Sequence, residues 1–472
     1  MTATQIAIAI AAILYLAFMA VTRRRVSFDE FATAGRSMGP WLTFAGLAAT
    51  FVGPAMTMGL TRAGYQVGWL YLPCAILAGT NLLLISQYVA QPMRSKFAGA
   101  RSLGEVTAGP KSHNSKTVRL LIACIGFSLT AAISIVMSKA SGELLNHAFG
   151  LPRIWGILLG TGLVTAYSCR GGIRATMQTD AVQLCGFALL VPMLLVCMVA
   201  SPEFSWTAWK QSSLQSTQSA FDSHSTIAFF SLFVFWFLGS GFDPTNVNRI
   251  LSARSPSVSK RSMRRNGFFV IVWMSVMYLL GTIGQSVAPA LPINDQIILA
   301  LGQTYFGSIL YALFIVAMLG VILSTQDSML NGASVLLAND IARCMRPKLT
   351  ERQQLRIAVL STLALGVLSV SVSFLVDSIL QAIIFIWSVY TPSVAPVVIA
   401  SLYLEKPKPF PAIVSIISGF SISSSIVFSG YSSHIPAVFA GLLASSAAYL
   451  IAHRSVRKSV LKEKEPCHVR LS

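Results

Sequence analysis

A run of polar residues stands inside an apolar segment in the C-terminal half of the chain. Residues 315–340 read IVAMLGVILSTQDSMLNGASVLLAND, and the middle of this segment holds three hydroxyls, an amide and a carboxylate: Ser324, Thr325, Gln326, Asp327 and Ser328. A carboxylate at the centre of a bilayer costs roughly 3 kcal/mol unless something pairs with it. Hydroxyl, carbonyl and carboxylate oxygens are the ligands of small, hard cations. The segment therefore predicts a cation site, and the alternative is a polar seam between packed helices.

The composition is that of a polytopic membrane protein. Of the 472 residues, 54% are hydrophobic and 11% are charged, whereas soluble domains carry about 25% charged residues. The net charge of +19 comes from short basic clusters between apolar runs, so it does not indicate a nucleic-acid partner. The seven cysteines show no metal-ligand spacing, and we expect free thiols.

The elements that must position the polar run are membrane helices. Apolar runs of about 18 or more residues predict thirteen of them, at residues 3–21, 40–60, 69–91, 119–145, 153–169, 180–200, 226–245, 267–287, 306–336, 357–376, 379–402, 409–429 and 435–452. With the N-terminus outside, 31 of the 35 Lys and Arg residues fall in cytoplasmic segments and three fall outside. The positive-inside rule therefore predicts an outside N-terminus and a cytoplasmic C-terminus.

Two of the predicted helices are interrupted. Residues 48–60 read AATFVGPAMTMGL, and residues 235–246 read FWFLGSGFDPTN. Glycine and proline free backbone groups that lipid cannot satisfy, so a broken helix is tolerated where it lines a protein cavity. The two interrupted segments are five apart in the series, which predicts a 5+5 inverted repeat with a binding site near the midplane. The alternative is that Gly and Pro are simply common in membrane helices.

Six ordered motifs resemble those of the sodium:solute symporter family. The resemblance covers about residues 28–405 and rests on FATAGRSMGPW (31–41), TFVGPAMTMGLTRAGYQVG (50–68), GARSLGEV (99–106), YSCRGGIRATMQTDAVQ (167–183), PTNVNRILSA (244–253) and VILSTQDSMLNGAS (321–334). It implies an all-α fold with the inverted-repeat architecture of the leucine transporter, in which each repeat contains a broken helix.

The resemblance also implies a sodium site between the first broken helix and the polar segment. Its ligands are the backbone carbonyls of Ala49, Val52 and Val321 and the hydroxyls of Ser324 and Thr325. Family members often have Ala where Val321 stands, and a carbonyl ligand does not depend on the side chain.

A second cation site is implied beside the first. It takes Asp180, Ser324, Asp327 and Ser328. Two close carboxylates repel unless an ion or a proton lies between them, so coupling to a second cation or a proton is the sharper hypothesis. Helix capping by Thr179 or Asp180 is the alternative.

The family alignment places Gly53, Trp236 and Ser240 around the solute. Proline carriers of the family have an aromatic residue where Ser240 stands and an acidic residue where Phe51 stands, which speaks against proline. Ordinary helix packing is the alternative for Trp236.

We therefore expect a secondary active transporter that couples sodium to the uptake of a small organic solute. The alternatives are a proton-coupled symporter of the same fold and a transporter-like solute sensor. An enzyme is not expected, because none of the six histidines lies well inside a span and neither an HExxH motif nor a phosphate loop is present. We expect no cofactor other than sodium as coupling ion, no nucleic-acid partner, and a functional monomer in the bilayer of the cell (inner) membrane.

The expected organisation follows from the spans. It comprises an N-terminal helix and cytoplasmic linker (1–39), a first repeat (40–200), an outside loop (201–225), a second repeat (226–402), two further helices (403–453) and a cytoplasmic tail (454–472). Lys139 and Glu143 are four apart in one span and are predicted to neutralise each other.

Overall fold

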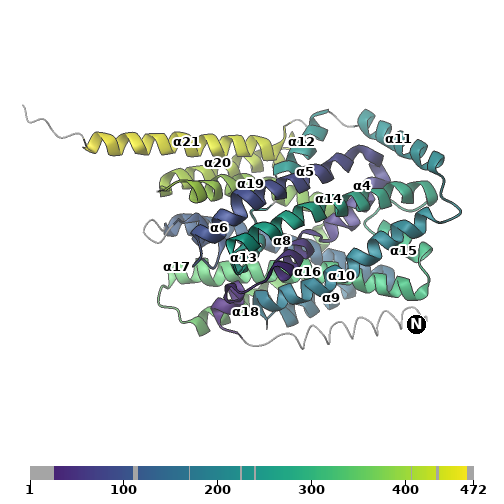
Figure 1. Cartoon of the computed structure of the whole chain (residues 1–472), viewed down its shortest axis with the longest axis horizontal. Helices are drawn as coiled ribbons and strands as arrows, with labels where there is room; N and C mark the ends of the chain where they lie inside the picture. The colour runs from purple at the N-terminus through teal and green to yellow at the C-terminus, as the bar shows by residue number, and fades with distance from the viewer. Residues whose placement is uncertain are drawn as a thin grey trace, which may run out of the picture.

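The chain folds into a bundle of helices. The computed structural model describes residues 26–109, 115–169, 171–223, 226–238, 241–405, 407–431 and 435–464. Within these ranges the α-helices are α2 Phe28–Thr33, α3 Pro40–Phe51, α4 Met58–Val67, α5 Leu72–Ile85, α6 Gln91–Lys96, α7 Leu103–Thr107, α8 Lys116–Phe149, α9 Arg153–Ser168, α10 Gly172–Val199, α11 Trp206–Ser223, α12 Thr226–Leu238, α13 Pro244–Ser252, α14 Pro256–Val287, α15 Ile297–Tyr305, α16 Ser308–Val335, α17 Arg343–Met345, α18 Glu351–Val372, α19 Ile379–Tyr403, α20 Pro409–Phe428 and α21 Ala437–Lys464. The long helices run along the long axis of the molecule (Figure 1).

Nine helical stretches in the described part of the chain are long and apolar enough to cross a bilayer. They are Pro54–Lys96, Lys116–Phe149, Gly172–Val199, Pro256–Val287, Ser308–Met345, Glu351–Leu375, Ile379–Tyr403, Pro409–Phe428 and Ala437–Val456. The predicted span 3–21 lies outside the described residues. Three other predicted spans are represented by shorter helices, because α3, α12 and α9 have 12, 13 and 16 residues. The count of thirteen therefore stays a prediction.

Side-chain caps fix where several long helices begin. The hydroxyl of Ser115 accepts a hydrogen bond from the Val118 amide at the start of α8. Ser255 caps α14 in the same way, and Pro256 follows it at the first helical position. Such caps satisfy amides that have no partner within the helix.

Both predicted helix breaks are confirmed. α3 ends at Phe51, Gly53 is extended (φ −66°, ψ 178°), and a short 3₁₀ turn follows before α4 begins. The second break separates α12 from α13, and Gly241 adopts a φ of +102° there, a conformation that favours glycine. The backbone of the second break therefore favours glycine at position 241, and Pro54 begins the 3₁₀ turn of the first break.

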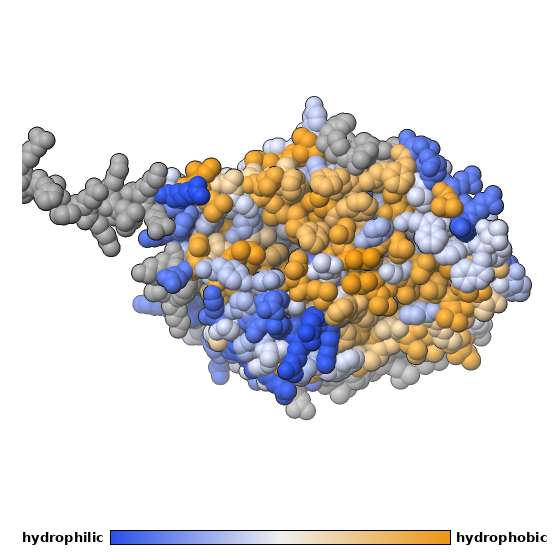
Figure 2. Space-filling view, turned by 45° about the horizontal axis from the view of Figure 1, so that its top comes forward, coloured by the Kyte–Doolittle hydropathy of each residue, from blue (hydrophilic) through white to orange (hydrophobic). Residues whose placement is uncertain are grey.

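The helix with the polar run lies at the centre of the bundle. α16 packs against α8, α10, α18, α3 and α13, and nearly all of its residues from Phe314 onward are buried. α20 and α21 pack on each other and on α19. A broad apolar surface crosses the face shown in Figure 2, and hydrophilic side chains gather toward its two ends. This distribution is that of a chain that lies across a bilayer.

One end of the molecule carries α6 and α17 (Figure 1), and we call it the α6 end. Ion pairs tie its connecting segments together. Asp29 pairs with Arg36 at 3.1 Å and with Arg101 at 2.8 Å. Arg119 of α8 pairs with Asp340, which follows α16, at 2.7 Å, and Asp340 is fully buried. The motifs at residues 31–41 and 99–106 therefore supply arginines whose ion pairs with Asp29 hold this end together.

The opposite end carries α11 and α15 (Figure 1), and we call it the α11 end. The predicted pair of Lys139 and Glu143 is confirmed at 3.6 Å, and Arg153 joins it at 3.3 Å from the same carboxylate. Arg62 of α4 pairs with Asp295 at 3.3 Å. The expected outside loop 201–225 contains α11, which packs on α14.

Candidate functional site

The first broken helix and α16 bring oxygen atoms together in the buried centre. The hydroxyl of Ser324 lies 3.0 Å from the Val321 carbonyl and 3.5 Å from the Ala49 carbonyl. The hydroxyl of Thr325 lies 3.2 Å from the Val321 carbonyl. Val52, the last residue before the extended Gly53 and the cap of α3, is fully buried.

The break in α3 explains why carbonyl oxygens face α16. The last carbonyls of a helix have no partner within it, and the extended backbone at Gly53 prevents the next turn from forming. Gly53 also allows close approach, since a Cβ at this position would lie 2.9 Å from the Thr325 Oγ1. Neutral carbonyl and hydroxyl oxygens in a buried cluster suit a hard monovalent cation.

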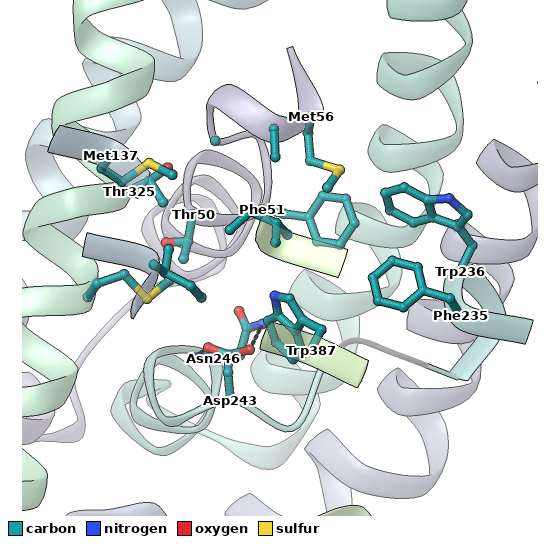
Figure 3. A pocket seen from close by; sticks show the side chains of 15 residues that line it. Thr50, Phe51, Met56, Met137, Phe235, Trp236, Asp243, Asn246, Thr325 and Trp387 are labelled. Carbon is teal, nitrogen blue, oxygen red and sulfur yellow. Dashed lines mark hydrogen bonds between the residues drawn. The ribbon is translucent and has the colours of Figure 1, made fainter. Parts of the chain in front are cut away.

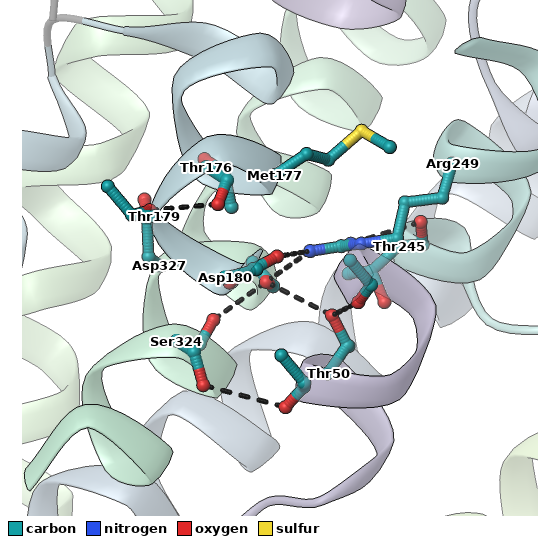
Figure 4. Close-up of polar contacts among 12 residues, drawn as sticks. Thr50, Thr176, Met177, Thr179, Asp180, Thr245, Arg249, Ser324 and Asp327 are labelled. Atoms are coloured by element: carbon teal, nitrogen blue, oxygen red, sulfur yellow. Dashed lines mark hydrogen bonds and ion pairs between the residues drawn. The ribbon is translucent and has the colours of Figure 1, made fainter. Parts of the chain in front are cut away.

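A buried arginine occupies the neighbourhood predicted for a second cation. Nη2 of Arg249, on α13, lies 2.9 Å from Oδ2 of Asp180 on α10 and donates to the Ser328 hydroxyl on α16 at 2.6 Å (Figure 4). The side chains of Arg249 and Asp180 are 2% and 0% exposed. The guanidinium therefore joins three helices, and its charge offsets that of Asp180.

The other two residues of the predicted second site lie around this ion pair. Asp327 accepts a hydrogen bond from Ser168 of α9 at 2.6 Å, and Ser324 faces α3 as described above. Ser328 also donates to the Ser324 carbonyl at 2.7 Å. Figure 4 shows Asp180, Ser324 and Asp327 in one region, and the hydrogen bonds of Ser328 place it there too. Their role as ligands stays a prediction.

Beside the oxygen cluster lies a cavity whose walls are mostly apolar. Its empty volume is about 680 Å³, part of it open to solvent. It is lined by Thr50, Phe51, Gly53, Ala55, Met56, Ile133, Met137, Phe235, Trp236, Asp243, Asn246, Thr325, Met329, Ile383 and Trp387. A mostly apolar cavity with a few polar groups is the usual form of a small-molecule site.

Two of the three predicted solute residues, Gly53 and Trp236, line this cavity. Ser240 lies outside the described residues. Figure 3 shows Trp236 and Phe235 from α12 facing Phe51 from the first break, with Trp387 of α19 nearby. The cavity therefore lies between the two broken helices, where an inverted repeat predicts it.

Sequence reasoning missed Asp243, Asn246 and Trp387 in the cavity and Arg249 in the ion pair. A signal for Asp243 was present, because Asp before Pro after a glycine-rich stretch is typical of a helix start. The Asp243 side chain caps α13 by accepting from the Asn246 amide at 2.9 Å. The partnership of Arg249 with Asp180 had no local signal, since the two residues are far apart in sequence.

Comparisons with known proteins agree on the family. A profile of the sodium:solute symporter family matches residues 31–419. The sodium/proline symporter 2 of Staphylococcus saprophyticus subsp. saprophyticus is 26% identical over 432 residues, which cover 86% of this chain and 82% of that protein. A sodium/proline symporter of Staphylococcus aureus shows the same identity and coverage.

Solved structures share the fold. The substrate-bound outward-open structure of a Na⁺-coupled sialic acid symporter superposes with a TM-score of 0.78 at 18% identity and covers 94% of this chain and 97% of that chain. A nucleobase-cation-symport-1 family transporter with bromovinylhydantoin bound superposes with a TM-score of 0.62 at 12% identity and covers 91% and 95%. The architecture is therefore the leucine-transporter type that the family resemblance implied. The chain belongs to the sodium:solute symporter family, and it is a sodium-coupled secondary transporter rather than an enzyme.

Proposed function

We propose that the oxygen cluster between α3 and α16 binds the coupling sodium ion and that the adjacent cavity binds a small organic solute. The ligands are the carbonyls of Ala49, Val52 and Val321 and the hydroxyls of Ser324 and Thr325. One observation carries the proposal: Thr325 belongs to both sites, because it lies 3.2 Å from the Val321 carbonyl and also lines the cavity.

This shared wall couples the two ligands. A sodium ion held by oxygens of both α3 and α16 favours the conformation in which these helices lie together. A ligand shifts a conformational equilibrium only by its differential affinity for the two states. Since Gly53 and Thr325 also line the cavity, the conformation that binds sodium is the one with a complete solute site.

Sodium entry then drives solute uptake by alternating access. One positive charge gains about 2.3 kcal/mol per 100 mV of membrane potential. The α6 end, rich in Lys and Arg, faces the cytoplasm in this proposal, with the N-terminus outside and the C-terminus inside, and the chain works as a monomer in the cell membrane. The orientation rests on the distribution of basic residues in the sequence.

A second cation is proposed only for a state in which Arg249 has left Asp180. In the present arrangement the guanidinium supplies the positive charge that two neighbouring carboxylates require. Asp180, Ser324, Asp327 and Ser328 are the oxygen donors that remain if Arg249 withdraws. The Arg249 guanidinium and a second transported cation thus compete for the same position beside Asp180.

The solute is a small organic molecule that fits an aromatic-walled cavity. The named relatives are sodium/proline symporters, and the structural neighbour is named for sialic acid. An identity of 26% or less leaves the cavity residues free to differ, and the apolar Phe51 in its wall continues to speak against proline.

Uptake into proteoliposomes tests the proposal. A panel of labelled small amino acids, sugars, carboxylates and vitamins is offered with an inward sodium gradient and with potassium instead. Wild type should accumulate one class of solute with sodium only. The double variant Ser324→Ala and Thr325→Ala should lose this stimulation.

A matched control removes an equally buried hydroxyl pair elsewhere. Ser334 of α16 and Thr362 of α18 lie 2.6 Å apart and are buried, so Ser334→Ala with Thr362→Ala should keep the sodium stimulation. Equal sodium dependence in the Ser324 and Thr325 variant and in wild type would refute the proposed ion site.

A further inference from the structure

One wall of the cavity carries a buried carboxylate that no cation neutralises within the described part of the chain. Asp243 lines the cavity and is 1% exposed. No salt bridge reaches it from any described residue, and the nearest arginine along α13, Arg249, is engaged with Asp180. An ionisable residue inside a membrane protein that lacks a counter-ion points to a ligand that supplies one.

The helix cap accounts for the orientation of Asp243 and for only part of the stabilisation of its charge. The carboxylate accepts hydrogen bonds from the Thr245 hydroxyl, the Asn246 amide and the Asn246 side chain. All of these donors are neutral. They fix the carboxylate in place, and the positive end of the α13 dipole offsets part of its charge, but no cationic side chain of a described residue pairs with it.

A second polar group in the same wall lacks a partner. Nδ2 of Asn246 points to Asp243, because the opposite orientation of the amide would place its oxygen against a carboxylate oxygen. The Oδ1 of Asn246 has no hydrogen-bond donor among the described residues, and the residue is 6% exposed. Buried acceptors without a donor are rare in proteins, so this oxygen also indicates a ligand that donates.

The aromatic residues of the cavity suit a cationic group. Phe51, Phe235, Trp236 and Trp387 line it, while Lys, Arg and His are absent from the lining residues. Aromatic ring faces attract cations. The indole Nε1 of Trp236, 4% exposed, finds no acceptor among the described residues. Asp243, Asn246 and Trp387 lie together on one side of the cavity in Figure 3, and Trp236 lies on another.

We propose that the solute carries a protonated nitrogen whose N–H groups bind the Asp243 carboxylate and the Asn246 Oδ1, and a hydrogen-bond acceptor that faces Trp236. The cavity then selects organic cations and zwitterions. It rejects small anions that lack such a nitrogen, because their charge would meet the Asp243 carboxylate without compensation. This inference rests on the proposed function, since it takes the cavity to be the solute site.

Matched pairs of small compounds test the selectivity. Each pair differs in one protonated nitrogen, as β-alanine differs from 3-hydroxypropanoate and L-prolinamide from tetrahydrofuran-2-carboxamide. The melting temperature of the purified full chain in detergent is measured with sodium and each compound. At least one nitrogen-bearing member should raise it, and its oxygen isostere should not. The proposal is overturned if the oxygen isostere raises the melting temperature as much as its nitrogen-bearing counterpart. It is also overturned if none of the nitrogen-bearing compounds raises it.

The variant Asp243→Asn separates charge from folding. Asn caps helices as well as Asp does, so the start of α13 should be retained. Affinity for the responding compound should fall roughly 30-fold or more, the size expected when one member of a buried charge pair is removed. Asp222→Asn, which removes an exposed carboxylate from α11, should leave the affinity unchanged. Unchanged affinity in Asp243→Asn would contradict the assignment.

A sodium titration without solute distinguishes this inference from the proposed function. The rise in melting temperature with sodium alone should be the same in Asp243→Asn and wild type. If that rise persists in the Ser324→Ala and Thr325→Ala variant, the proposed sodium site is wrong. If it is lost there while Asp243→Asn still binds the cationic compound, only the inference about the solute is wrong.

Discussion

The guanidinium of Arg249 lies 2.9 Å from the carboxylate of Asp180, and both side chains are almost completely buried. The two residues belong to α13 and α10, so the pair fastens the second broken helix to the last helix of the predicted first repeat. Through Ser328 the same guanidinium reaches α16, the helix with the candidate sodium ligands. The ion pair therefore links the second broken helix to α10, and the hydrogen bond to Ser328 extends this link to α16.

Removal of one partner should destabilise the protein strongly. Arg249→Gln leaves the Asp180 charge buried, and breaking a buried ion pair costs about 3–5 kcal/mol. We expect a clear fall in the melting temperature of Arg249→Gln in detergent, and a similar fall for Asp180→Asn. The melting temperature of the double variant should fall by much less than the sum of the two single falls, because no buried charge remains unpaired. Strictly additive falls would show that the two side chains do not interact.

Loss of Arg249 should also change the sodium dependence. Asp180 and Ser328 belong to the proposed second cation site, and they lose their present cationic partner when the guanidinium is absent. We expect the melting temperature to rise more steeply with sodium concentration in Arg249→Gln than in wild type. The slope should return to the wild-type value when Asp180→Asn is added. The same slope in all three proteins would count against a competition between Arg249 and a cation.

A methyl group at Gly53 should weaken sodium binding. The Cβ of Gly53→Ala would lie 2.9 Å from Thr325 Oγ1 and 3.2 Å from its Cγ2, so the Thr325 side chain must shift from its present position. We expect sodium affinity to fall by roughly tenfold or more, the effect of about 1.4 kcal/mol.

Gly162→Ala on α9 is the control for Gly53→Ala. No atom lies within 4 Å of a Cβ at Gly162, and alanine is the better helix former. Its sodium affinity should match that of wild type. If Gly53→Ala also matches wild type, Thr325 does not hold the ion at this break.

The ion pairs of Asp29 predict a loss of stability at acidic pH. Burial raises the pKa of the Asp29 carboxyl, but Arg101 and Arg36 lower it more, so the pKa lies below its usual value. The stabilisation is complete above the unfolded-state pKa of about 3.9 and is lost as the pH falls through the folded-state pKa. We expect Asp29→Asn to lower the melting temperature at pH 7 and to differ less from wild type near pH 3. A difference independent of pH would mean that the charge of Asp29 is not involved.

The helix breaks and the expectation of a cation site in residues 315–340 came from local chemistry. The set of sodium ligands was implied by the family resemblance and stays a prediction. Gly53 and Pro54 free backbone groups that lipid cannot satisfy, and the hydroxyls of Ser324 and Thr325 in an apolar segment need polar partners. These signals and the family motifs together indicated where along the sequence α3 and α16 lie.

The Arg249 contact depends on tertiary packing and could not be predicted in the same way. Its guanidinium passes close to α3 because Gly46 has no side chain, and a Cβ at Gly46 would lie 2.9 Å from the Arg249 Nε. Neither the spacing of residues along α13 nor the motif around Asp180 reports such a long-range fit. The partnership of Asp327 with Ser168 is of the same kind, since it joins α16 to α9.

Sodium binding to the purified chain tests the central claim most directly. Binding of ²²Na⁺ is measured at equilibrium in detergent, without solute, for wild type, for Ser324→Ala with Thr325→Ala, and for the control Ser334→Ala with Thr362→Ala. We expect saturable binding in wild type and in the control, and binding at least about 100-fold weaker in the Ser324 and Thr325 variant, the effect of losing about 2.7 kcal/mol. Equal affinity in all three proteins would contradict the account.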